Sequence, residues 1–148
     1  MKKINKWENT LNFSLYENLI LSKIPKRNTN YDITDINNSK IDIIIDLSTQ
    51  KDSYDIPKNT KYYHIIFEKK KILAEDKINF IMNILNNNKN KKILIHCHYG
   101  FNRTGFIFVN YLCNNGIKIV DALNIFSTLR GRGIKYVELI SYLKNKFQ

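Results

Sequence analysis

Cys97 and Arg103 are the residues whose types and spacing could do chemistry, since five positions separate a sulfur nucleophile from a guanidinium. The apolar run Ile93–Ile95 before the cysteine predicts a short buried strand, and a second apolar run, 106–109, follows the arginine in a predicted helix. A strand, a loop and a helix N-terminus form an anion site, because the first helical amides lack partners and the dipole is positive there. A cysteine and an arginine at the two ends of the loop indicate phosphoryl transfer.

The loop would bind a tetrahedral phosphate through backbone amides between Cys97 and Arg103, which can curl into a nest around an oxyanion. The same dipoles would stabilise the thiolate. Arg103 presents a planar fork that holds two phosphate oxygens at once, and Gly100 relieves strain where the loop takes unusual dihedrals. The residues expected to bind phosphate are His98, Tyr99, Gly100, Phe101, Asn102 and Arg103.

Neighbouring residues have expected supporting roles. Thr104 places a hydroxyl beside the sulfur, where it could stabilise sulfur as the leaving group when a phosphocysteine is hydrolysed. His96 would lie behind the loop and hold its shape through backbone hydrogen bonds, and Gly105 completes the motif. Cys97, Arg103 and Thr104 are the expected catalytic residues of this segment.

The loop resembles the Cys-x5-Arg-Thr/Ser-Gly signature of the cysteine-dependent phosphatases, which include the protein tyrosine and dual-specificity enzymes. The run 96–105 is more specifically similar to the loop of metal-independent RNA 5′-triphosphatases, namely the triphosphatase domain of metazoan capping enzymes and the baculovirus RNA phosphatase. Further similar segments extend the likeness from about Trp7 to the C-terminus: 46–48 with 54–55, 61–63 and 133–135. The resemblance implies a protein-tyrosine-phosphatase-like (dual-specificity) fold.

Asp46 lies near the end of a β-branched run, 41–47, which predicts a central strand buried on both faces. Because α/β sheets place their sites at this edge, the carboxylate either belongs to the site or makes a structural hydrogen bond to loop amides. In the triphosphatases that the chain resembles, the matching aspartate lies close to the phosphate loop. We therefore expect Asp46 to be an accessory catalytic residue.

The segment after the next strand departs from tyrosine phosphatases, in which the corresponding loop carries an aspartate that protonates the leaving oxygen. Here it holds Glu68 followed by three lysines, 69–71. A phenoxide needs a proton as it leaves, whereas a diphosphate is a weaker base and departs with less help. The missing aspartate therefore favours cleavage of a phosphoanhydride. Glu68 is the candidate acid, with a solvated loop residue as the alternative.

Composition sets broader limits. The 148 residues suffice for a single domain, with residues 1–30 expected as an N-terminal arm packed on it. The net charge of +11 suggests a polyanionic partner, although it does not distinguish RNA from a phosphoprotein. Arg130 and Arg132 either line a substrate groove or are exposed charges of a turn. Two cysteines, no signal peptide and no membrane-length apolar run predict a soluble intracellular protein, cytoplasmic or nuclear. The abundance of Asn, Ile and Lys is typical of an AT-rich genome and would fit a large DNA virus.

The expected fold is α/β, with a central sheet of four or five mostly parallel strands and helices on both faces. Residues 18–22 are expected as an edge strand, and the strand before Cys97 as a central one. The next strand after the 41–47 run is expected over 62–67. Helices are expected over 33–38, capped by Asp32, and over 75–88, 103–113, 120–129 and 136–147.

We expect neither a metal nor a cofactor. His96, Cys97 and His98 together with His64 could suggest zinc, but adjacent residues leaving a strand point in alternate directions, and no CxxC or HxxxH pair supplies further ligands. The expected reaction is attack by the Cys97 thiolate on a terminal phosphorus, then hydrolysis of the phosphocysteine.

The preferred substrate is the γ-phosphate of 5′-triphosphate RNA, a step of mRNA capping, since the resemblance to the triphosphatases is the narrower one. The alternatives are a dual-specificity or tyrosine phosphatase acting on a phosphoprotein, and a phosphate- or RNA-binding pseudoenzyme. The intact Cys97, Arg103 and Thr104 argue against the pseudoenzyme. The oligomeric state is not predicted.

Overall fold

The computed structural model describes residues 13–27, 40–50 and 53–148, and its strands form a central sheet in the order β1-β2-β5-β3-β4. β1 pairs antiparallel with β2, and the other neighbours are parallel. The strand that leads into Cys97 is therefore central, and the expected mostly parallel sheet is confirmed. The strands are β1 (Phe13–Tyr16), β2 (Leu19–Ser22), β3 (Ile43–Asp46), β4 (Lys61–His64) and β5 (Ile93–His96).

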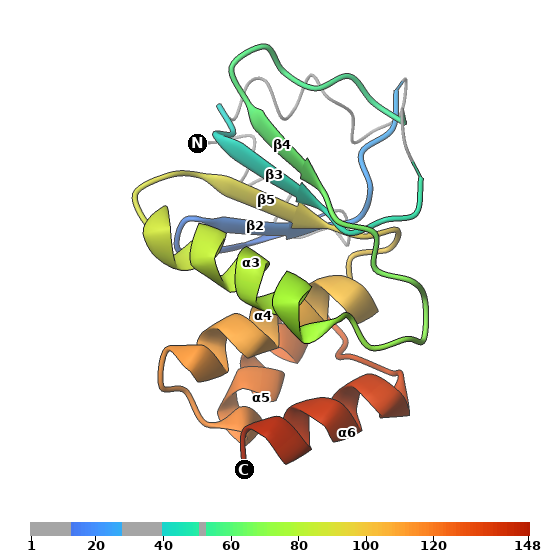
Figure 1. Ribbon diagram of the computed structural model, residues 1–148, viewed down its shortest axis with the longest axis vertical. Helices are drawn as coiled ribbons and strands as arrows, with labels where there is room; N and C mark the ends of the chain where they lie inside the picture. Colours follow the sequence, from blue (N-terminus) through green and yellow to red (C-terminus); the bar gives the residue numbers. More distant parts are fainter. Residues whose placement is uncertain (1–12, 28–39, 51–52) are drawn as a thin grey trace.

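The helices of the described part cover one face of this sheet (Figure 1). They are α3 (Glu75–Asn87), α4 (Asn102–Asn114), α5 (Ile119–Arg130) and α6 (Val137–Lys146), and each agrees with its expected range to within one residue at either end. α4 is the central helix, because it contacts α3, α5 and α6 as well as β5. Within the described ranges, no helix combines the length and the apolar character needed to cross a membrane.

One expectation about the layers is wrong, and a second is only partly covered by the described residues. Residues 18–22 do not form an edge strand, because β1 pairs with the outer side of β2. The described helices lie on one face, and the helix expected over 33–38 with its Asp32 cap falls outside the described residues, as does half of the expected arm. The described part of that arm is the β1–β2 hairpin, which belongs to the sheet itself. The strand expected over 62–67 is shorter, since β4 ends at His64.

Alternation along the strands divides the core in two. Ile43 and Ile45 of β3 point toward the helices and join the large cluster around α3 and α4. Ile44 points to the other face, where it packs in a smaller cluster with Leu94 and Tyr54. Since side chains along a strand alternate with period two, a residue's place in the strand decides its layer.

The register brings polar residues to the same end of the sheet. Asp46, the last residue of β3, is level with His96 of β5 and with His64 of β4, and Ser22 of β2 is level with His96. By alternation these side chains share the face opposite the helices. The carboxyl ends of four parallel strands thus present polar groups just behind the loop that follows β5.

Gly105 sets how closely α4 approaches α5. A Cβ at this position would lie 2.6 Å from Cε2 of Phe126 and 2.8 Å from Cγ1 of Ile134, both in buried side chains. We predict that Gly105→Ala lowers the free energy of unfolding by about 1 kcal/mol, because an overpacking cost of about 1–3 kcal/mol exceeds the helix-propensity gain of alanine. Urea unfolding measures the change.

The matched control is Gly133→Ala, where a Cβ would meet only Ser127 Cβ at 3.4 Å, an ordinary contact. Its stability should stay within about 0.5 kcal/mol of the parent. A Gly105→Ala variant as stable as the Gly133→Ala variant would contradict the close-packing explanation.

Candidate active site

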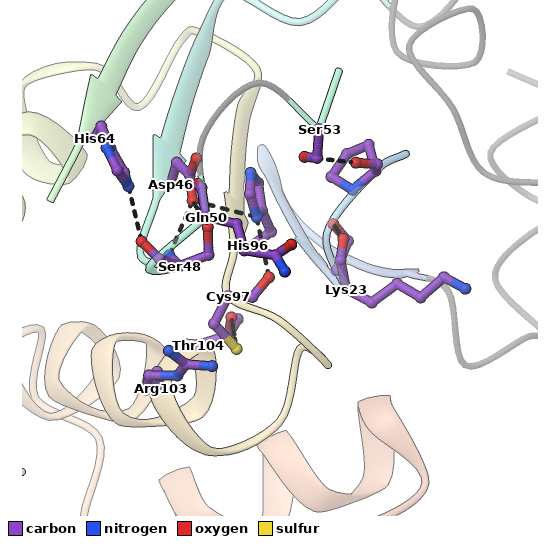
Figure 2. Close-up of polar contacts among 12 residues, drawn as sticks. Lys23, Asp46, Ser48, Gln50, Ser53, His64, His96, Cys97, Arg103 and Thr104 are labelled. Atoms are coloured by element: carbon purple, nitrogen blue, oxygen red, sulfur yellow. Dashed lines mark hydrogen bonds and ion pairs between the residues drawn. The ribbon is translucent and has the colours of Figure 1, made fainter. Parts of the chain in front are cut away.

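Cys97 lies just after β5, at the floor of a pocket, and is only 2% exposed. Its Sγ accepts hydrogen bonds from the Gly100 amide at 3.2 Å and from the Thr104 hydroxyl at 3.1 Å. Two donors therefore point at the sulfur, the atom that would attack a phosphorus. Figure 2 shows Arg103 and Thr104 close to the cysteine. The structure thus brings the three residues together.

The loop between Cys97 and α4 is shaped by its contact with β2. Gly100 has a φ of +83°, which glycine adopts at little cost. A Cβ there would lie 2.5 Å from the carbonyl carbon of Ser22, so a side chain would push the loop away from the sheet. The Ile24 amide, just beyond β2, donates to the His98 carbonyl at 3.0 Å.

Arg103 reaches the pocket from the first turn of α4 and is nearly buried. Its Nη1 donates to the carbonyl of Phe67 at 3.0 Å, in the segment that follows β4. Because Phe67 is fully buried, this bond holds the guanidinium in place before any ligand arrives. A guanidinium has five N–H donors, so one bond to the protein leaves enough of them for two oxygens of an anion.

The loop, the β3–β4 connection, the segment after β4 and the start of α6 together enclose a pocket of about 300 Å³. Tyr99 stands at its rim and is 63% exposed, in contrast to Cys97 at the floor. Among the described residues, the lining contains no carboxylate. It consists of Thr49, Gln50, Lys69, Cys97, His98, Tyr99, Phe101, Asn102, Arg103 and Tyr136.

The field at the wall of this pocket is positive. Partial burial is the largest cause that lowers the pKa of His98 below its usual value, and the positive charges of Lys26, Arg103 and Lys69 lower it further. Cations that disfavour protonation of a histidine also attract an anion to the same place. The pocket therefore suits a phosphate or a polyphosphate.

Asp46 does not line the pocket; it is buried behind the loop. Its Oδ1 accepts from the Ser48 amide at 2.9 Å and from the Ser48 hydroxyl at 2.7 Å, and its Oδ2 accepts from the Tyr62 hydroxyl at 2.5 Å. The His64 ring bonds the Ser48 carbonyl at 2.8 Å. This carboxylate therefore holds the β3–β4 connection, which carries Thr49 and Gln50 into the lining, and its catalytic role stays a prediction.

His96 connects this network to the loop, as Figure 2 shows. Its Nδ1 lies 3.1 Å from the Cys97 carbonyl, an acceptor, so Nδ1 carries the proton. Its Nε2 then accepts from the Tyr54 hydroxyl at 2.6 Å. Complete burial lowers the pKa of His96, and the nearby Asp46 carboxylate, 3.7 Å from Nδ1, opposes this only in part. The neutral ring therefore orients the first peptide of the loop.

Glu68, the candidate acid, points away from the pocket. Its carboxylate pairs with Lys71 at 2.7 Å, both side chains are more than half exposed, and Glu68 is absent from the lining. The Lys71 hydrogen bond and charge lower the pKa of Glu68, which opposes a role as a proton donor near neutral pH. The neighbouring Lys69 lines the pocket instead.

Arg130 is a supporting residue whose place the sequence did not reveal. It is 1% exposed at the end of α5 and is neither a groove residue nor an exposed turn charge, the two alternatives considered for it. Its Nε donates to the Gly100 carbonyl at 3.1 Å, its Nη1 donates to Ser14 Oγ at 3.1 Å, and it lies over the Phe101 ring. Arg132 is exposed and covers the same ring.

Asn102 supports the pocket from the other end of the loop. Its Oδ1 accepts from the amides of Lys135 at 2.7 Å and Tyr136 at 3.2 Å, which ties the start of α4 to the segment before α6. The residues expected to bind phosphate lie in the loop or in the first turn of α4, and Gly100 alone among them is outside the lining, with its amide on the sulfur.

Arg130 generates a prediction about anion binding. Arg130→Met keeps much of the side-chain length but leaves the buried Gly100 carbonyl without its donor, so it should cost about 1–3 kcal/mol of stability and weaken phosphate binding about tenfold. Arg132→Met removes the same charge from an exposed position on the same ring and is the matched control. Inhibition by inorganic phosphate measures the affinity, and equal weakening in both variants would show that charge alone is responsible.

His96 generates a prediction about pH. Its pKa is lowered on folding, so the unfolded chain binds a proton below pH 6.5 that the folded protein does not bind. This histidine thus costs nothing above that pH and reduces stability as the pH falls below it, by at most about 1.4 kcal/mol per pH unit. His96→Asn should show a shallower fall of unfolding free energy between about pH 6.5 and pH 5.

The His98→Asn variant serves as the comparison, because the pKa of this partly exposed histidine is also lowered. Urea unfolding at several pH values should show a smaller change of slope for His98→Asn than for His96→Asn. An unchanged slope in His96→Asn would show that the buried ring is protonated with little penalty.

Comparison with known proteins agrees with the geometry. The family model of the dual specificity phosphatase catalytic domain matches residues 26–147. The RNA/RNP complex-1-interacting phosphatases of Mus musculus and Bos taurus are 32% and 31% identical over 119 and 118 residues. These matches cover 74% and 73% of this chain, but only 37% and 36% of those proteins, so the chain spans little more than a third of their length.

Solved structures share the fold. Kinase associated phosphatase, crystallised with serine in place of its catalytic-site cysteine, superposes with a TM-score of 0.78 at 18% identity and covers 95% of this chain and 98% of that one. OH1 from the Orf virus, described as a tyrosine phosphatase, gives a TM-score of 0.71 at 16% identity and covers 92% and 86%. With the family match, the cysteine–arginine loop and this fold, the chain belongs to the dual specificity phosphatases within the cysteine-dependent phosphatase superfamily.

Proposed function

We propose that this domain removes the γ-phosphate of 5′-triphosphate RNA through a phosphocysteine and leaves a 5′-diphosphate end, as in the first step of mRNA capping. The observation that carries this proposal is the lining of the pocket. Among the described residues it contains no carboxylic acid, while Lys69, His98 and Arg103 present nitrogen donors. A diphosphate leaves without a full proton transfer, whereas the alkoxide or phenoxide of a protein substrate needs one.

The mechanism follows from the contacts at the floor. The Cys97 thiolate attacks the terminal phosphorus, and the phosphorus–oxygen bond to the leaving diphosphate breaks. Loop amides and the Arg103 guanidinium hold the equatorial oxygens as charge develops on them. Water then attacks the phosphocysteine, and the Thr104 hydroxyl, 3.1 Å from Sγ, stabilises the departing thiolate. Asp46 acts at a distance in this scheme, by holding the β3–β4 connection.

Further observations support an RNA substrate. The chain carries a formal net charge of +11, which favours a long polyanion over an isolated phosphate ester. The curated relatives are named for interaction with an RNA/RNP complex. The Gly-Phe-Asn-Arg-Thr-Gly run, 100–105, resembles the loop of the RNA 5′-triphosphatases.

A protein phosphatase is the second candidate, and the match to the dual specificity phosphatase catalytic domain favours it. For that activity the leaving alkoxide or phenoxide would need a proton source, and Glu68 would have to leave Lys71 and turn into the pocket. A phosphate-binding pseudoenzyme is disfavoured, because the sulfur of Cys97 is already held by two donors suited to a thiolate.

The decisive assay compares phosphate release from γ-labelled triphosphate-ended RNA, a phosphotyrosine peptide and free ATP, all in EDTA. We expect RNA to be hydrolysed with a kcat/KM at least about tenfold above that of the peptide, because the site lacks a lining acid. Phosphate release from RNA should persist in EDTA, since thiolate, amides and guanidinium supply the nucleophile and the positive charge.

Cys97→Ser is the control for this assay. It should abolish turnover, because a serine hydroxyl is a far weaker nucleophile than a thiolate, and it should retain RNA binding because the loop amides and Arg103 remain. A clear preference for the peptide would make the domain a protein phosphatase. RNA binding with no turnover in the parent would leave a binding module.

A further inference from the structure

Lys69 occupies a defined place in the pocket wall although it belongs to a loop. The residue two positions before it, Phe67, is fully buried, donates its amide to the Leu47 carbonyl at 3.2 Å and accepts from Arg103. The residue after it, Lys70, has a φ of +64° and places its ammonium over the Tyr136 ring, 5.7 Å from the centroid. The backbone on both sides of Lys69 is thus anchored.

The charge of Lys69 is directed to the pocket and is not used elsewhere among the described residues. The neighbouring carboxylate, Glu68, is paired with Lys71 outside the pocket, and no described acidic group forms an ion pair with Lys69. Its charge acts across the pocket, since it is one of the cations that lower the pKa of His98.

Cys97 and Lys69 line the same pocket at different depths. Cys97 is buried at the floor, whereas Lys69 is exposed at the rim of the same pocket. A thiolate that attacks from the floor expels the leaving oxygen on the opposite side of the phosphorus, toward the rim. Arg103 is held near the floor by its bond to Phe67, so the leaving group needs another cation.

We infer that Lys69 is a catalytic residue whose ammonium pairs with the leaving diphosphate and thereby adapts the site to phosphoanhydrides; this inference rests on the proposed triphosphatase function. In the first step the bond from Sγ to the γ-phosphorus forms, and the bond from that phosphorus to the β,γ-bridging oxygen breaks. The electron pair stays on the oxygen of the departing diphosphate, where the Lys69 charge stabilises it. Water then forms a bond to phosphorus, the sulfur–phosphorus bond breaks with its electron pair on sulfur, which restores the thiolate, and both protons of the water stay on the released phosphate as H2PO4⁻.

The lysine is suited to this leaving group for a physical reason. A diphosphate gains negative charge on several oxygens, and an ammonium is a compact point charge that can stabilise any of them. The same charge helps little when the leaving oxygen carries a single negative charge that spreads into an aromatic ring, as in an activated aryl phosphate. Replacing Lys69 should therefore lower kcat strongly for a diphosphate leaving group and only slightly for an activated phenol.

The test compares Lys69→Gln with Lys69→Arg, which keeps the charge, and with Lys58→Gln, which removes an exposed lysine outside the pocket lining. Steady-state kcat and KM are measured on triphosphate-ended RNA and on a series of aryl phosphates whose leaving phenols differ in pKa. Circular dichroism and urea unfolding check that each variant is folded.

We expect Lys69→Gln to lower kcat on RNA about 10- to 100-fold, somewhat less than the loss of a buried oxyanion donor, with less than about twofold loss on the most activated aryl phosphate. The dependence of kcat/KM on the pKa of the leaving phenol should become steeper. Lys69→Arg should restore most of the rate on RNA, and Lys58→Gln should resemble the parent.

Two results would overturn the assignment. A higher KM on RNA with unchanged kcat would mean that Lys69 only binds the substrate. Equal losses on every substrate would mean that it only supports the loop. If the parent does not hydrolyse RNA, the proposed function is wrong. The aryl phosphate series still tests the role of Lys69 separately. If kcat/KM depends on the pKa of the leaving phenol in the same way in Lys69→Gln as in the parent, the lysine does not stabilise the leaving group.

Discussion

A loop that turns its amides toward one anion must turn its carbonyls away from it, and buried carbonyls need donors. In this domain two of those donors come from segments far away in the sequence. His96 supplies the one for the Cys97 carbonyl, Arg130 the one for the Gly100 carbonyl, and an amide beyond β2 the one for the His98 carbonyl. The phosphate cradle is therefore stable only when β2, β5 and α5 are packed around it, which links the chemistry to the whole fold.

The polar side chains at the carboxyl end of the sheet are buried under the same constraint, since each needs a hydrogen-bond partner. The register of the parallel strands places Asp46, His96 and His64 level with one another, on the face away from the helices. Burying such groups is costly unless each finds a partner. Here Ser48 and the hydroxyls of two tyrosines supply partners, so the network is satisfied and rigid. It holds the start of the loop on one side and the β3–β4 connection on the other.

The floor and the rim of the pocket have different roles: the floor holds the reacting groups, and the rim faces the rest of the substrate. The floor consists of Cys97, Arg103 and the loop amides, and it can serve any phosphoryl transfer through a thiolate. The rim comes from separate segments, which contribute Gln50, Lys69 and Tyr136. In the proposed mechanism the leaving group departs toward the rim, so the charge there would discriminate between substrates. The family match accounts for the floor, and the substrate depends on residues outside the motif.

Local patterns in the sequence by themselves determined the ranges of the four described helices, the central strand and the cysteine–arginine loop, because apolar periodicity and short spacings act within a few residues. The tertiary structure decided which neighbours reach the pocket. Asp46 turned out to lie behind the loop, Glu68 outside the pocket and Arg130 within the core. The β1–β2 pairing also removed 18–22 from the edge. These outcomes depend on partners far apart in the chain, such as Arg130 and Ser14, whose proximity exists only after the strands and helices have packed.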